Sequence, residues 1–177
     1  GNSYAGITDK TSLSFTSTDT TAPSLSSSSP ADNATAVAVG GNIVLNFSEA
    51  VDVESGNIVI YKASDDSTVE TIAVTSSQVT GTGTTQITIN PSSDFDSSTE
   101  YYVQIAATGF DDSSGNSYAG ITDKTSLSFT SADTTAPSLS SSSPADNATA
   151  VAVGGNIVLN FSEAVDVESG NIVIYKS

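Results

Sequence analysis

Acidic and amide side chains are concentrated in two stretches of the sequence, residues 48–56 (SEAVDVESG) and 110–123 (FDDSSGNSYAGITD), and neither stretch contains Lys or Arg. Carboxylate and amide oxygens are the ligands that Ca²⁺ prefers, and it takes about six to eight of them. Gathered at one place without a cation, these groups would repel one another. The two stretches therefore predict a calcium site, with these candidate ligands: Glu49, Asp52, Glu54, Asp111, Asp112 and Asn116.

A second interpretation of the same two stretches stays open. Acidic loops are commonly just solvated, without any bound ion. Asp and Asn also shape turns by bonding through their side chains to nearby backbone groups. A metal site requires that the folded chain bring the two stretches together, so the elements that carry them have to be identified.

The residue types exclude most catalytic constellations. The chain has no Cys and no His, so it has no thiol nucleophile, imidazole base or imidazole metal ligand. Asp111 and Asp112 form a carboxylate pair, but adjacent loop residues do not flank a substrate as the two carboxylates of a glycosidase do. No Trp is present to form an aromatic platform for a sugar. We expect a protein that is not an enzyme.

The charge balance points to cations as partners. Four basic residues stand against twenty acidic residues, and the formal net charge is −16 at pH 7. Nucleic acid and anionic membrane surfaces would be repelled by such a chain. No apolar run approaches the ~18 residues that a membrane-spanning helix needs. We therefore expect neither nucleic-acid binding nor membrane insertion, and divalent cations as the natural partners.

The sequence repeats itself with a period of 114 residues. Residues 1–63 and 115–177 are identical except for Thr18, which corresponds to Ala132, and Ala63, which corresponds to Ser177. This period is the size of an independently folding domain and too long for one turn of a solenoid. Segments rich in Thr, Asp and Pro at 16–24 and 130–138 read as linkers. The chain thus divides into the end of one repeat (1–19), a complete repeat (20–133) and the start of another (134–177).

Within the complete repeat, short β-rich segments alternate with turn-forming residues. Ile43, Leu45 and Phe47 alternate with other side chains, as do Leu127 and Phe129, which predicts strands with one buried face. No helical period is present. About seven such strands in about 110 residues predict an all-β immunoglobulin-like sandwich of antiparallel strands. The expected strands are 24–29, 42–49, 57–62, 68–76, 85–90, 100–108 and 125–131.

Two smaller patterns have specific interpretations in such a fold. Tyr101 and Tyr102 follow an acidic loop and occupy the position of a tyrosine corner, although a plain core aromatic fits almost as well. The segment TGTGTT at 80–85 suggests either a flat threonine array for ice or carbohydrate, or a glycine-rich hairpin between two strands. The hairpin is the simpler explanation.

The residues also resemble a known family. The segment APSLSSSSPADNATAVAVGGNIVLNFSEAVD, followed by INPSSDFDSSTEYYVQI and GFDDSSGNSYAGI, is similar to bacterial Ig-like domains that occur in tandem in large secreted adhesins of the RTX type. This resemblance implies a calcium-stabilised spacer domain that carries a distant binding region away from the cell. Periplasmic copper-resistance sandwiches share the SPAD and FSEAVD segments, but they bind copper through His and Met, and this sequence has neither.

In an Ig-like sandwich the two acidic loops lie at the same pole, beside the linker from the preceding domain. That linker contains Asp19, which joins the predicted ligands. By the repeat, Asp133 of the next linker would share an ion with Glu163 and Asp166. The opposite pole would gather another acidic group, for which solvated turns and one extra ion both stay open: Asp32, Asn33, Asp65, Asp66, Asp94 and Asp96. No Gly-centred loop follows Asp94 and Asp96, so an EF-hand is excluded.

Three classes of function are consistent with a repeated β-sandwich. An enzyme requires a unique, unrepeated site, and a carbohydrate-binding module requires exposed aromatics on one sheet. A spacer requires only a nearly constant repeat, as observed here. The repeat thus favours a spacer, and the family resemblance implies that it is an extracellular, non-catalytic, calcium-stabilised spacer of a bacterial cell-surface adhesin active in biofilms; a carbohydrate-binding or ligand-binding module of a secreted protein is the alternative. Its partners would be neighbouring repeats, and any host or surface ligand would be bound by regions outside this chain.

Overall fold

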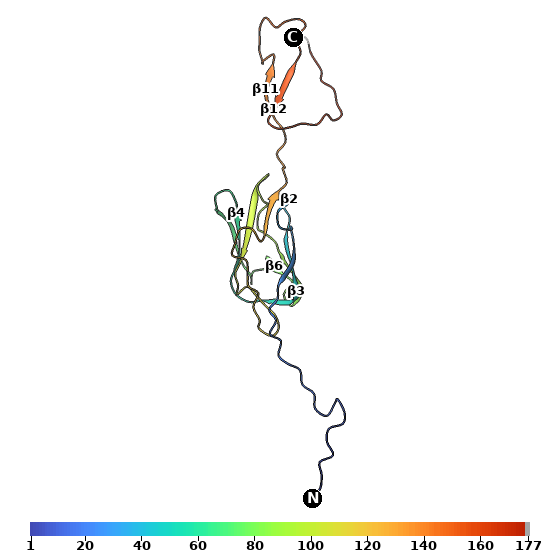
Figure 1. Cartoon of the computed structure of the whole chain (residues 1–177). Coiled ribbons are helices and arrows are strands. Elements are labelled where there is room, and N and C mark those ends of the chain that lie inside the picture. The colour runs from blue at the N-terminus through green and yellow to red at the C-terminus, as the bar shows by residue number, and fades with distance from the viewer. Residues whose placement is uncertain (176–177) are drawn as a thin grey trace. The chain divides into compact units, whose positions relative to one another are not determined.

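The computed structural model describes residues 1–175 and divides the chain into two units, Gly1–Asp133 and Thr134–Ser177. The described residues contain strands and turns but no helix, and hence no helix that could cross a membrane. The first unit is a sandwich of two sheets (Figure 1). The prediction of an all-β Ig-like sandwich is confirmed.

The first sheet follows the order β1-β3-β7-β6, and the short strand β9 pairs with the far end of β3. All of its strand pairs are antiparallel. Alternation along β3 buries Ile43, Leu45 and Phe47 against the opposite sheet. The strands of this sheet are β1 (Leu25–Ser29), β3 (Ile43–Val53), β6 (Val79–Thr80), β7 (Thr84–Ile89) and β9 (Phe110–Asp111).

The second sheet follows the order β2-β10-β8-β4-β5. Its pairs are antiparallel except β2 with β10, which run parallel, so the expectation of antiparallel strands fails at this one edge. Leu127, just before β10, and Phe129 within it are fully buried in the core. The strands are β2 (Ala34–Val37), β4 (Asn57–Lys62), β5 (Thr68–Ala73), β8 (Glu100–Ile105) and β10 (Ser128–Ser131).

Aromatic clusters mark the two ends of the core. Phe95, Tyr101 and Phe129 pack together at one end, with ring centroids 4.8 to 5.7 Å apart. The ring of Phe47 lies 5.5 Å from that of Phe110 and 5.2 Å from that of Tyr118, close to the second acidic stretch. Burial of large aromatic side chains supplies much of the free energy that holds such a small sandwich together.

The tyrosine corner is present. The backbone N–H of Asp96 donates a 2.8 Å hydrogen bond to the hydroxyl of Tyr101, five residues downstream. Tyr101 is also buried in the core, so the two interpretations of this residue are both satisfied.

The glycine-rich segment forms the hairpin between β6 and β7. Gly81 has φ +103°, and a Cβ there would lie 2.0 Å from the backbone oxygen of Gln86, so only glycine fits. The hairpin prediction for this segment is therefore confirmed. Gly83 N–H donates to the oxygen of Val51, which places the hairpin against the acidic end of β3.

The second unit contains one antiparallel pair, β11 (Leu139–Ser143) with β12 (Val158–Phe161). This pair reproduces the register of β1 with β3, including its irregularity near the start of the first strand. By the repeat, the strands expected at 24–29, 42–49 and 57–62 predict three strands in this unit, but residues 171–175, which correspond to β4, form none. In the complete repeat β4 pairs with β5 and β8, and residues 134–175 contain no counterpart of either strand.

Candidate metal site

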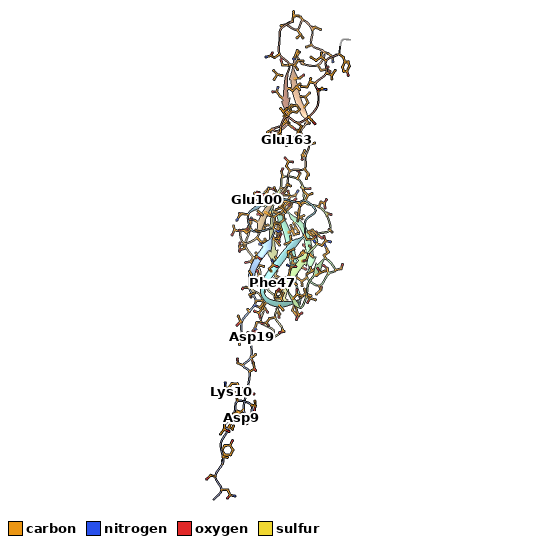
Figure 2. All side chains as sticks on the ribbon, turned by 90° about the vertical axis from the view of Figure 1, so that its right-hand side faces the viewer. Asp9, Lys10, Asp19, Phe47, Glu100 and Glu163 are labelled. Carbon is orange, nitrogen blue, oxygen red and sulfur yellow. The ribbon has the colours of Figure 1, made fainter. Side chains whose placement is uncertain are left out.

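Three carboxylates from separate segments converge at the end of the first unit where the N-terminal linker enters. Asp19 comes from the linker, Glu49 from β3 and Asp112 from the loop after β9, and one carboxylate oxygen of each lies within 4.8 Å of the other two. Asp112 is only 5% exposed, Glu49 is half-buried and Asp19 is exposed. Figure 2 labels Asp19 where the chain meets the sandwich. We call Asp19, Glu49 and Asp112 the carboxylate triad.

Asp112 is fixed by the loop that follows it. One carboxylate oxygen accepts hydrogen bonds from the backbone N–H groups of Ser114 and Asn116, both at 2.8 Å. The other accepts a 2.8 Å bond from the side-chain amide of Asn116. These bonds, first of all those from Asn116, hold the pKa of Asp112 below its ordinary value. Asp112 is therefore ionised and held in one orientation.

Asp19 is held in two ways. Its carboxylate accepts a 2.9 Å bond from the backbone N–H of Thr21, which forms a local turn in the linker. Its backbone carbonyl accepts a 3.2 Å bond from the side-chain amide of Asn116, 97 residues away in sequence. The linker carboxylate is thus brought to the two domain carboxylates by protein groups.

The surroundings of Glu49 disfavour its ionised form. Its partial burial, followed by the nearby charges of Asp19 and Asp112, raises the pKa of Glu49. The lysines of the complete repeat are engaged elsewhere, Lys62 with Asp96 at 2.6 Å and Lys124 with Asp66. The triad is an electronegative group that a proton or a cation would stabilise.

The other predicted ligands of the two stretches lie outside the triad. Asp52 and Asp111 face each other across the β3–β9 pair. Asp112 follows the last residue of β9 and belongs to the triad, whereas Asp111 is paired within the sheet. The oxygen Oδ1 of Asp111 is buried and has no hydrogen-bond partner among the described residues. Glu54 is exposed beyond the end of β3. The predicted cluster of six thus splits, with Asp112, Glu49 and Asn116 on one side and Asp52 with Asp111 on the other.

Thr82 is a residue of this region that the sequence did not single out. Its hydroxyl lies 3.2 Å from Oδ1 of Asp52 and accepts a 3.1 Å bond from the backbone N–H of Val53. The hairpin of residues 80–85 brings it there. The sequence did predict the hairpin that contains Thr82. It did not indicate which strand the tip of that hairpin would contact.

The repeat-related residues are divided between the two units. Asp133 belongs to the first unit, where it accepts a 2.9 Å bond from the hydroxyl of Ser97. Glu163 and Asp166 belong to the second unit. A shared ion between Asp133, Glu163 and Asp166 remains a prediction.

At the opposite pole, four of the five predicted acidic side chains have hydrogen-bond or ion-pair partners: Asp32, Asp65, Asp66 and Asp96. Asp32 accepts bonds from the backbone N–H and the hydroxyl of Ser128, at 2.9 and 3.0 Å. Asp65 accepts from Ser67, while Asp66 and Asp96 pair with lysines. Turn-type hydrogen bonds occur at both poles, but among the described residues lysine pairs only with carboxylates of the opposite pole and not with the triad.

Comparison with known families identifies the repeat. The family model described as bacterial Ig-like domain matches residues 19–131 and again 133–177. No curated protein matches the chain. Domains of this family are generally non-catalytic structural modules and typically occur in surface or extracellular proteins. The two matches together cover most of the sequence, and the chain belongs to the family of bacterial Ig-like domains.

Proposed function

We propose that this chain is part of a calcium-stabilised spacer of a large bacterial surface adhesin, in which tandem repeats hold a distal binding region away from the cell. The observation that carries the proposal is the carboxylate triad, which joins a linker residue, Asp19, to two residues of the domain, Glu49 and Asp112. An ion bound there would connect the linker to the sandwich.

The triad fits Ca²⁺ in chemistry and in size. Its donors are all oxygens, and the chain has no Cys or His to favour a softer metal. Calcium–oxygen distances of about 2.3–2.6 Å allow two ligands on opposite sides of the ion to lie up to about 5 Å apart. The mutual separation of the triad oxygens, within 4.8 Å, falls inside that span. Water and further protein oxygens would complete the coordination.

The near-identity of the repeats supports a spacer. Residues 1–63 and 115–177 differ at two positions, so the same site is expected in successive repeats. A long, stiff spacer requires such repetition, whereas an active site needs to occur only once. The linkers contain Pro and are short, and thus unlike free Gly/Ser tethers. The strongly negative charge opposes the misassociation to which neighbouring domains of like sequence are prone while they fold.

Thermal unfolding of the chain in calcium and in EDTA tests the proposal. Calcium binds the folded repeat and should raise the melting temperature by an amount that grows with the logarithm of its concentration above Kd. Glu49→Gln should abolish most of that rise. It should also stabilise the metal-free repeat at neutral pH, because a raised pKa means that ionising Glu49 destabilises the fold as the pH rises through that pKa.

The matched control is Asp65→Asn, which removes one exposed charge at the opposite pole and should leave the calcium response intact. An identical melting temperature in millimolar calcium and in EDTA would refute the calcium site. Equal loss of the response in Glu49→Gln and Asp65→Asn would indicate general charge screening in place of a coordinated ion.

A further inference from the structure

We infer that Asn116 is a positioning residue that docks the linker onto the sandwich before any ion binds, so that calcium locks a linker that is already in place. The inference deepens the proposed function, since it concerns how the same site is assembled. It assigns the side-chain amide a role as hydrogen-bond donor, whereas the sequence had suggested an oxygen ligand.

The amide nitrogen of Asn116 joins the two halves of the site. It lies 3.2 Å from the backbone oxygen of Asp19 and 2.8 Å from Oδ2 of Asp112, and it can donate one proton to each. Among the described residues, the bond to Asp19 is the only hydrogen bond between residues 18–22 and the rest of the repeat. The polar attachment of residues 18–22 therefore depends on this one side chain, and the next hydrogen bonds along the linker are the two between Ser24 and Ser48.

The loop itself does not need the amide. Backbone groups close it, because Asp112 N–H donates to Asn116 O at 3.0 Å and Gly115 N–H donates to Asp112 O at 3.0 Å. The backbone N–H groups of Ser114 and Asn116 bind the Asp112 carboxylate. Removing the side chain should thus release the linker and leave the loop closed.

Docking by a neutral donor matters because the triad repels itself. Asp19 has to be held near two negative groups, because its carboxylate oxygen lies within 4.8 Å of those of Glu49 and Asp112. A bond to the backbone carbonyl of Asp19 holds the residue without using its carboxylate, which stays available to an ion. Part of the entropic cost of ordering the linker is then met before calcium arrives, which favours tighter binding.

The test compares three variants of the full chain in EDTA by backbone ¹⁵N relaxation of residues 18–22. Asn116→Ala removes the donor, and Asn116→Asp keeps the shape but replaces the donor with an acceptor. Asn2→Asp is the matched control, because Asn2 occupies the same position of the repeat at the exposed N-terminus. We expect residues 18–22 to become mobile in both Asn116 variants and to stay ordered in Asn2→Asp and in the unchanged chain.

A calcium titration measures what the docking contributes to ion binding. Loss of one hydrogen bond should weaken calcium binding about 3- to 10-fold in Asn116→Ala. Asn116→Asp serves only in the relaxation measurement in EDTA, because its added carboxylate beside Asp112 would attract the ion whether or not residue 116 coordinates it. Unchanged order of residues 18–22 in EDTA in the Asn116 variants would overturn the inference, as would simultaneous loss of order in residues 112–116. If the unchanged chain bound no calcium, the proposed function would fail, while the relaxation result would still decide the role of Asn116.

Discussion

Residues 1–17 and 115–131 have the same sequence but occupy different surroundings, and they differ in which parts of their structure form. Both copies make the same local turn. Asp9 accepts bonds from the backbone N–H groups of Thr11 and Ser12, at 2.8 Å each, and Asp123 accepts the equivalent bonds from Thr125 and Ser126 at the same distances. A turn made within four residues needs no tertiary partner.

The strand behaves differently in the two copies. Ser128–Ser131 form β10 between β2 and β8, whereas residues 14–17 form no strand. Phe129 is 1% exposed and its counterpart Phe15 is 92% exposed. Leu127 and Leu13 show the same contrast, at 0% and 71%. A strand depends on hydrogen bonds and burial that only neighbouring strands supply, so identical sequence does not secure identical structure.

Truncating the paired phenylalanines should give the largest effect. Phe129→Ala empties a core position and should cost about 3–5 kcal/mol of unfolding free energy. Phe15→Ala should change it by less than about 0.5 kcal/mol, because an exposed side chain loses no packing. Urea denaturation of both variants measures this difference. Comparable losses in the two would mean that residues 1–17 are packed against other parts of the chain.

Removing the paired lysines should give a smaller difference. Lys124 contacts both carboxylate oxygens of Asp66 and lies 5.6 Å from the centre of the Tyr102 ring. These are surface contacts, so Lys124→Ala should lower the melting temperature by at most a few degrees. Lys10→Ala is the control at the same position of the repeat and should have no effect. A larger loss from Lys10→Ala than from Lys124→Ala would contradict the structure.

The local turn should show the smallest difference between the copies. Hydrogen bonds from Ser126 and Thr125 lower the pKa of Asp123 to about 2, and the equivalent bonds from Ser12 and Thr11 lower the pKa of Asp9. NMR titration should find both well below the usual range. Because the same local turn lowers the pKa of Asp9 outside the sandwich, the lowered pKa of Asp123 should add little to the pH dependence of domain stability. An ordinary pKa at Asp9 would show that the turn depends on the folded domain.

The longer strands of the sandwich can be predicted from the sequence, and the shortest ones cannot. All seven predicted strands overlap an observed strand, because alternation such as that of Ile43, Leu45 and Phe47 persists over several residues. The strands β2, β6 and β9 were missed, since two to four residues are too few to show a period.

The site was predictable in outline only. The fold class placed the acidic loops and the linker at one pole, where Asp19, Glu49 and Asp112 indeed meet. It did not indicate that Asp111 would pair with Asp52 while Asp112 joined the triad, because that depends on a two-residue strand. The bond from Asn116 to a backbone carbonyl 97 residues away leaves no mark in the sequence, since any residue at position 19 carries that carbonyl.

Small-angle X-ray scattering on a chain of four repeats tests the central claim most directly. If calcium at the carboxylate triad locks each linker, the maximum dimension should grow linearly with the number of repeats in calcium. In EDTA the distance distribution should contract or broaden, because the linkers are then held only by their protein contacts. A compact particle whose dimensions are the same in calcium and in EDTA would contradict the account.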